Sequence, residues 1–152
     1  MSAEEKLAAL GLLLPDPPQP AGAYTRAVRW GELIFVAGQL PLEQGKIRYA
    51  GRVGAELSLE EGYAAARLCA LNGLSVLKAE AGGLEGVARI LRLGGFVASA
   101  EGFTDQAKVV NGASELFSGV LGQRGVHARL AVGVSQLPLG AAVELEIIAA
   151  LG

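Results

Sequence analysis

The stretch Arg124-Gly-Val-His-Ala-Arg-Leu-Ala-Val-Gly-Val-Ser-Gln-Leu-Pro-Leu-Gly-Ala-Ala-Val-Glu-Leu-Glu-Ile147 decides the fold class. Both of its halves alternate in the manner of β-strands, and Leu-Pro-Leu-Gly marks a turn between them. Successive strand side chains point to opposite faces, so we expect one aliphatic face and one face carrying Arg129, Glu144 and Glu146. The stretch is therefore predicted to be a β-hairpin whose charged face holds either a binding site or a solvated ion pair.

The rest of the chain predicts strands and helices in an α+β order. The capping box Ser58-Leu-Glu-Glu61 starts a helix that Gly82-Gly83 ends, and a second helix is expected over 104–121. Gly94-Gly95 indicates a bulge or a close backbone approach within a strand. Two helices on one face of a mixed sheet follow from this order, and the uncovered face calls for an oligomer. The expected strands are 23–30, 33–36, 46–53, 87–99 and the two halves of the hairpin.

The N-terminal residues 1–20 predict an extra helix and a connector. Residues 3–14 have helical spacing, with Ser2 as N-cap and Glu5 three positions later. The Pro-rich run 15–20 stops any helix and reads as an extended connector. We expect residues 1–152 to form a single domain with this helix on its outside.

Composition restricts the function classes. The chain has 152 residues, of which 51% are hydrophobic and 18% charged, and this apolar balance favours a symmetric oligomer. No apolar run is long enough to span a membrane. The acidic N-terminus does not resemble a signal peptide, and a single cysteine fits a cytoplasmic protein. A net charge of −2 without a Lys/Arg cluster makes nucleic acid a poor candidate partner.

The chain lacks the residues that metal binding and phosphate binding usually require. The only histidine, His127, and the only cysteine, Cys69, give no metal-ligand set, and no phosphate-binding loop motif occurs, so no metal or cofactor is expected. Cys69 is interpreted as an inert core thiol and Asn72 as a buried amide satisfied by backbone. His127 is interpreted as a partly exposed residue at a strand start.

What remains is Arg129 with Glu144, together with Asn111 and Tyr24. A guanidinium suits bidentate recognition of a carboxylate, and a carboxyl group beside a ligand can act as general acid or base. These residues predict a site for a small organic acid.

The segment Ala37-Gly-Gln-Leu-Pro41 resembles the S-G-Q-x-P signature of the RidA/YjgF family, the reactive enamine/imine deaminases. Tyr24, Asn111, Ala128-Arg129 and Leu137-Pro138 with Val143-Glu-Leu-Glu146 follow in matching order. The spacing of 15 from Arg129 to Glu144 also matches the family. The resemblance covers about residues 22–150. In length the chain resembles the branch of the family whose members have roughly 150 residues.

The resemblance implies a chorismate-mutase-like α+β fold and a homotrimer with ligand sites between subunits. It implies that Arg129 clamps the carboxylate of a 2-imino acid, that Tyr24 and Asn111 shape the pocket, and that Glu144 lies near the attacking water. Gly38 would let backbone approach the ligand. The implied reaction hydrolyses an imine to a 2-keto acid and ammonia without metal or cofactor.

The sequence departs from the family pattern at a few positions. Ala131, which the resemblance places in the substrate site, stands where active relatives usually have Cys, and Ala37 replaces the signature serine. Two alternatives to the deaminase therefore stay open. One is a non-catalytic small-carboxylate binding or regulatory protein. The other is an endoribonuclease or translation inhibitor, which the acidic balance disfavours.

Overall fold

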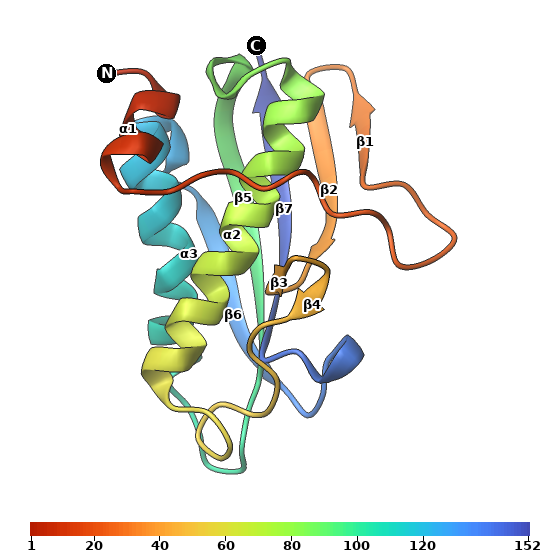
Figure 1. Ribbon diagram of the computed structural model, residues 1–152, viewed down its shortest axis with the longest axis vertical. Helices are drawn as coiled ribbons and strands as arrows, with labels where there is room; N and C mark the ends of the chain where they lie inside the picture. The colour runs from red at the N-terminus through yellow and green to blue at the C-terminus, as the bar shows by residue number, and fades with distance from the viewer.

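The computed structural model describes residues 1–152. Its strands are β1 (Ala27–Trp30), β2 (Leu33–Gln39), β3 (Leu42–Glu43), β4 (Lys46–Ile47), β5 (Val87–Ala98), β6 (Ala128–Val134) and β7 (Val143–Leu151). Five of them form one sheet in the order β1-β2-β7-β5-β6, and β3 and β4 form a separate small hairpin (Figure 1). β5 and β6 are parallel, whereas the other neighbours in the large sheet are antiparallel.

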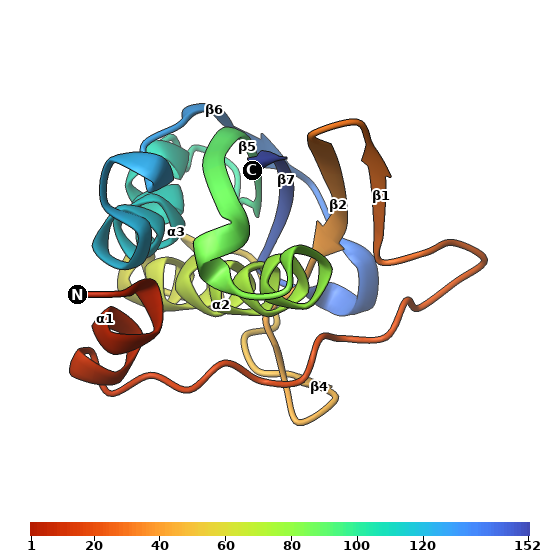
Figure 2. The same cartoon turned by 90° about the horizontal axis from the view of Figure 1, so that it is seen from above.

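The helices are α1 (Ala3–Ala9), α2 (Leu59–Ala81) and α3 (Gln106–Leu121). All three lie on the same side of the large sheet, and the connector after α1 runs along the outside of α2 (Figures 1 and 2). The predicted α+β fold with two helices packed on one sheet face is confirmed, as is the additional N-terminal helix. No helix is long and apolar enough to cross a membrane.

Both predicted capping boxes are present. The hydroxyl of Ser2 accepts from the Glu5 backbone N–H, and the hydroxyl of Ser58 accepts from that of Glu61, each at 3.1 Å. The reciprocal bonds from the glutamate side chains are also made. Gly82 ends α2 in the left-handed conformation with φ +74°, which a glycine adopts without strain. The ends of α2 are thus set by local sequence.

The packing of α3 depends on two glycine contacts. A side chain at Gly112 would overlap the Tyr63 backbone carbonyl, so the absence of one brings α3 directly against α2. A Cβ at Gly95 of β5 would lie 2.6 Å from a Val110 methyl of α3. The Gly94-Gly95 pair therefore serves close approach rather than a bulge, and the register shifts of β5 occur earlier, between Val87 and Arg89 and between Ile90 and Arg92.

The opposite face of the sheet is not covered by any element of the chain. Val28, Phe35 and Ile148 form one row across β1, β2 and β7 on this open face. Phe35 is 44% exposed, and Trp30 beyond it is 80% exposed. Large apolar side chains on an uncovered sheet face are unusual for a monomer.

The prediction of a β-hairpin over Arg124–Ile147 was wrong. β5 lies between β6 and β7, so the two strands do not pair with each other. The long connection through Leu137–Ala142 carries the chain past β5 before β7 begins. Alternation within each strand was correct, but it does not identify the neighbouring strand.

Two other boundaries differ from expectation. The N-terminal helix ends at Ala9 rather than residue 14, because Gly11 adopts φ +71° and the proline run follows. The strand expected over 46–53 reduces to Lys46–Ile47, followed by isolated bridges at Ala50 and Val53.

The contact at Gly112 is testable by substitution. Gly112→Ala should lower the free energy of unfolding by about 2 kcal/mol or more, because the new methyl forces α2 and α3 apart. Gly119→Ala on the same helix is the matched control, since its nearest neighbour would be a Leu10 methyl at 4.0 Å. It should be neutral or stabilising by up to about 1 kcal/mol. Urea denaturation measures both, and equal effects would contradict this account of the helix packing.

Candidate functional site

Arg129 projects from the edge strand β6 toward α3. Its guanidinium donates to the Ser114 hydroxyl at 2.9 Å and to the Ala107 carbonyl oxygen at 3.0 Å. Asn111, one helical turn before Ser114, lies with Arg129 and His127 along a pocket of about 300 Å³, called here the Arg129 pocket. Helix α3 therefore fixes the guanidinium and leaves its other N–H groups available to a ligand.

Glu144 of β7 lies against Gly38 of β2. The register between β2 and β7 shifts between Val36 and Gln39, and Gly38 falls within this irregularity. The Glu144 carboxylate occupies the space where a Gly38 side chain would project, so only glycine fits here without displacing it. The family signature thus includes the residue that admits the Glu144 carboxylate.

Asn72 of α2 holds the backbone that follows Gly38, from the helix-covered side of the sheet. Its amide nitrogen donates to the Leu40 and Leu42 carbonyl oxygens, each at 3.0 Å, and the side chain is buried. The prediction of a buried amide satisfied by backbone is confirmed. Asn72 acts on the site only through the position of the segment that follows Gly38.

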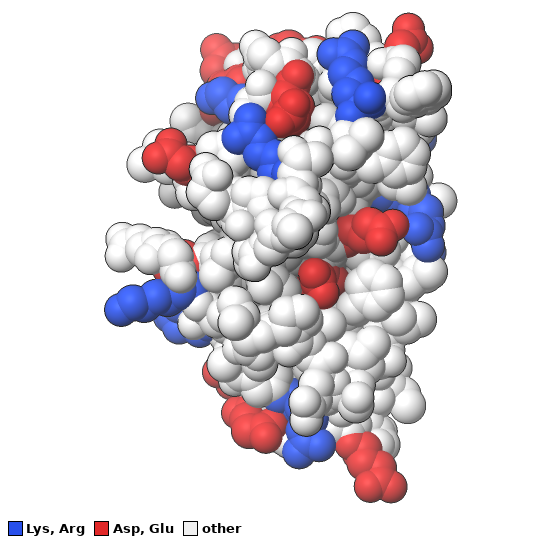
Figure 3. All heavy atoms as spheres, turned by 90° about the vertical axis from the view of Figure 1, so that its right-hand side faces the viewer, with Lys and Arg blue, Asp and Glu red and all other residues white.

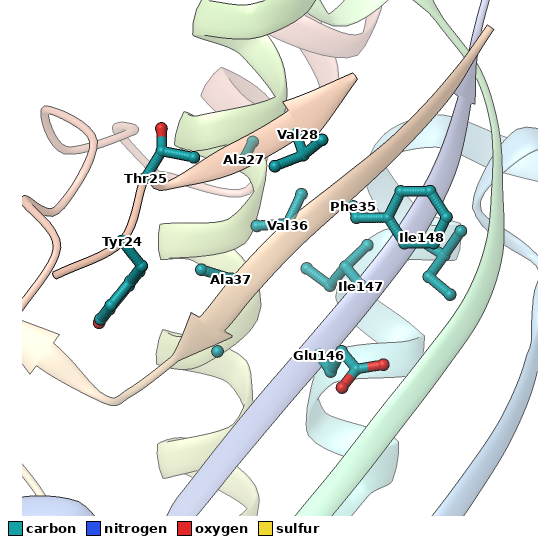
Figure 4. A pocket seen from close by; sticks show the side chains of 11 residues that line it. Tyr24, Thr25, Ala27, Val28, Phe35, Val36, Ala37, Glu146, Ile147 and Ile148 are labelled. Atoms are coloured by element: carbon teal, nitrogen blue, oxygen red, sulfur yellow. The ribbon is translucent and has the colours of Figure 1, made fainter. Parts of the chain in front are cut away.

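Tyr24 and Gly38 line a pocket of about 400 Å³ between the start of β1 and the open sheet face, called here the Tyr24 pocket. Tyr24 lies on one side of it, and Phe35, Ile148 and Glu146 lie on the other (Figure 4). Seen from the β1 side, the middle of the surface is largely uncharged, and acidic side chains lie near its hollow (Figure 3). The pocket therefore combines apolar walls with the carboxylate of Glu146.

The predicted residues fall into two groups on opposite faces of the sheet. Arg129 pairs with Leu93, which pairs with Ile147 on the helix-covered face. Glu144 pairs with Phe96 on the open face. The expectation that Arg129 and Glu144 share a face was wrong. β5 separates their strands, and its pairing with each of them directs the Arg129 and Glu144 side chains to opposite faces of the sheet. Asn111 accompanies Arg129, whereas Tyr24 and Gly38 accompany Glu144.

Ala131 lies on the same face of β6 as Arg129, next to Gly95 of β5. It is partly buried and packs against the core. Its methyl group can neither transfer a proton nor form a hydrogen bond, so this residue affects a ligand only through the space that it occupies.

Burial raises the pKa of Glu144, and the neighbouring Glu146 carboxylate raises it further. Burial lowers the pKa of His127 at the Arg129 pocket, and the charge of Arg129 acts in the same direction. The raised pKa favours the protonated form of Glu144, which makes this group suited to proton transfer.

Cys69 is buried in the core beneath β7, and burial raises the pKa of its thiol well above the ordinary value. No group of three or more His, Cys, Asp or Glu side chains lies close enough together to hold a metal ion. The titratable groups of interest are thus those at the Arg129 pocket and the pair Glu144 and Glu146 on the open sheet face.

Sequence reasoning missed Ser114 and placed Glu146 on the charged face without giving it a role in the site. Ser114 binds Arg129, and its position three residues after Asn111 places both on one helix face, which was the available signal. Glu146 lines the Tyr24 pocket and follows Glu144 by two residues, so strand alternation places both on one side.

The sheet with helices on one face, and polar groups divided between its edge strand and its open face, defines a chorismate-mutase-like α+β protein. The chain belongs to the YjgF/chorismate mutase-like family. The model of that family, described as "YjgF/chorismate mutase-like, putative endoribonuclease", matches residues 4–151.

Individual relatives agree with this membership. The chain is 46% identical over 143 residues to Protein TCP17 of Trypanosoma cruzi, covering 93% of this chain and 89% of that protein. It is similar to the structure of Atu1372 from Agrobacterium tumefaciens, with 42% identity, a TM-score of 0.92 and coverage of 99% and 92% of the two chains. It is also similar to RidA from the Antarctic bacterium Psychrobacter sp. PAMC 21119, with 25% identity, a TM-score of 0.65 and coverage of 90% and 94%.

The raised pKa of Glu144 has a consequence for stability. A carboxyl group with a higher pKa in the folded state opposes folding when ionised, and this penalty decreases as the pH falls through the folded pKa and is absent below the unfolded pKa. Glu144→Gln should therefore stabilise the protein at neutral pH, and the gain should shrink toward about pH 4. Thermal melts across this range measure it. The exposed Glu101→Gln, whose side chain makes no ion pair, should show no such pH dependence; a matching dependence would refute the assignment.

Proposed function

We propose that this protein is a 2-imino acid deaminase that works as a homotrimer. Arg129 and Asn111 of one copy face Tyr24, Gly38 and Glu144 of the next. The product is a 2-keto acid, and ammonia is released. Family membership supports the reaction class, since the RidA/YjgF family includes imine deaminases.

One observation supports the assembly more than any other, namely the division of the site between two faces. Within one chain, β5 lies between the strands of Arg129 and Glu144, which separates the strand axes by about 10 Å, and the two side chains then diverge. A single ligand of amino-acid size does not reach both. A second copy placed against the open face and the β6 edge brings the halves together and covers the exposed apolar rows.

The residues divide the chemistry between binding and proton transfer. Arg129 offers paired N–H donors to the substrate carboxylate, already oriented by Ser114. A water adds through its oxygen to the C=N carbon, and the π electron pair goes to nitrogen, which takes a proton. The carbinolamine then expels ammonia as its hydroxyl proton leaves and the C=O bond forms. Glu144, with its raised pKa, takes the proton from water and returns it to nitrogen.

Ala131 favours a second candidate, a protein that binds 2-keto acids without turnover. Its methyl replaces the thiol usual in the active branch, so proton transfer falls entirely on other groups. The Glu146 carboxylate at the Tyr24 pocket, with Glu144 nearby on the same sheet face, also repels a phosphate backbone, so we place RNA cleavage behind both candidates. A cytoplasmic location stays a prediction from the single cysteine.

Substitution at Arg129 separates the candidates. Arg129→Ala should lower kcat/KM for ammonia release from freshly generated imino acids by at least about 100-fold, and Arg129→Lys should recover part of it. Arg29→Gln, at an exposed residue of β1 outside both pockets, is the matched control and should leave activity unchanged. Wild-type turnover that is insensitive to Arg129 would refute the site. Binding of 2-keto acids without turnover would establish the binding protein instead.

Mixing variants tests whether the site forms between copies. Arg129→Ala and Glu144→Gln subunits, each inactive alone, should regain about one quarter of wild-type activity when co-assembled in equal amounts. The fraction arises because a site needs its arginine from one variant and its glutamate from the other, each present in half the subunits. Absence of any recovery in verified mixed oligomers would place the whole site within one chain.

A further inference from the structure

A third pocket, of about 190 Å³, lies on the helix side of the molecule and shares no lining residue with the Tyr24 or Arg129 pockets. Three segments far apart in the sequence form its walls, and Leu116 of α3 lies at its floor. Leu12 comes from the connector, Arg48 and Tyr49 follow the β3–β4 hairpin, and Arg67, Leu68 and Leu71 come from α2. We call it the hairpin pocket.

The floor of the hairpin pocket is apolar. Leu12, Tyr49 and Leu71 pack against the core from its margin and remain partly exposed, and the buried Leu116 of α3 closes the bottom. A concave surface of this kind gains free energy when an apolar body displaces its water. An apolar cavity of about 150 Å³ accepts a benzene molecule, so a ring or a branched aliphatic chain fits the available volume.

The rim of the hairpin pocket carries one unbalanced positive charge. The Arg48 guanidinium lies 3.4 Å from the Glu43 carboxylate and stands over the Tyr49 ring at 5.1 Å, so its charge is matched and its position held. The second guanidinium, Arg67, forms no ion pair with any carboxylate of the chain. The apolar floor and the Arg67 guanidinium together complement a molecule that has one carboxylate and an apolar body.

We propose that the hairpin pocket binds a small monocarboxylate with a branched aliphatic or aromatic body. The carboxylate meets Arg67, with Arg48 adjoining, and the body rests on Leu68, Leu71 and Tyr49. Because the connector and the hairpin supply two of its three walls, the site exists only where both segments are present. It is independent of the imine chemistry assigned to Arg129 and Glu144.

Calorimetry and methyl NMR with phenylacetate and 4-methylpentanoate test the proposal. We expect a Kd on the order of 1 mM or tighter, with shifts in the methyl signals of Leu12, Leu68 and Leu71. The neutral phenylacetamide and 4-methylpentanamide have the same shape and should bind at least about tenfold more weakly, because they lack the charge that Arg67 complements.

Three variants locate the binding. Arg67→Gln should weaken it at least about tenfold, and Ala64→Phe should abolish it by filling the pocket. Arg129→Ala should leave binding at the hairpin pocket unchanged. A failure of this proposal can therefore be told apart from a failure of the deaminase proposal. Thermal melts verify that each variant is folded. No binding by either acid, binding unaltered by Arg67→Gln, or binding lost in Arg129→Ala would each overturn the assignment.

Discussion

Strand β5 lies between β6 and β7 and hydrogen-bonds to both, and the placement of every site residue depends on this insertion. Because β5 and β6 are parallel, a crossover must join them, and α3 provides it. The crossover helix packs back on the sheet beside β6, which is why Ser114 and Ala107 are there to receive Arg129. Glu144 belongs to β7, on the far side of β5 from Arg129, and its side chain points to the opposite face of the sheet.

The same topology leaves one sheet face without a helix. Its apolar rows include Val28, Phe35 and Ile148, whose burial against another copy gains about 25 cal/mol for each Å² removed from water. Glu144 emerges on this same face, partly buried beside Gly38. Covering the face and completing the site are therefore one event in the arrangement we propose, which links assembly to activity.

Local sequence identified all three helices, although not the early end of α1, but it did not identify which strands are neighbours. The capping boxes at Ser2 and Ser58 and the left-handed Gly82 act within a few residues, so their effect is readable from the sequence. Alternation tells which residues of one strand share a face, whereas the relation between two strands depends on contacts distant in sequence.

For that reason the candidate residues could be picked out from the sequence, but their arrangement was predicted incorrectly. Arg129 and Glu144 were joined across a hairpin that β5 in fact interrupts. Ser114 was missed because a serine within a helix carries no sign of its partner until the crossover places it beside β6. Asn72 was interpreted correctly since a polar residue in an apolar helical stripe must find backbone partners.

The carboxylates of Glu144 and Glu146 are not equivalent, and their difference supports the proton-transfer role that we propose for Glu144. The Arg92 guanidinium lies 3.4 Å from the Glu146 carboxylate and compensates its charge. No cation pairs with Glu144, which is more buried and feels Glu146 two residues away, so burial and repulsion both favour its protonated form. Where environments separate two neighbouring carboxyl groups in this way, the one with the raised pKa keeps its proton to higher pH and is better suited to proton transfer. In the reaction we propose, where Ala131 offers only a methyl group, Glu144 is therefore the group that takes the proton from water and returns it to nitrogen.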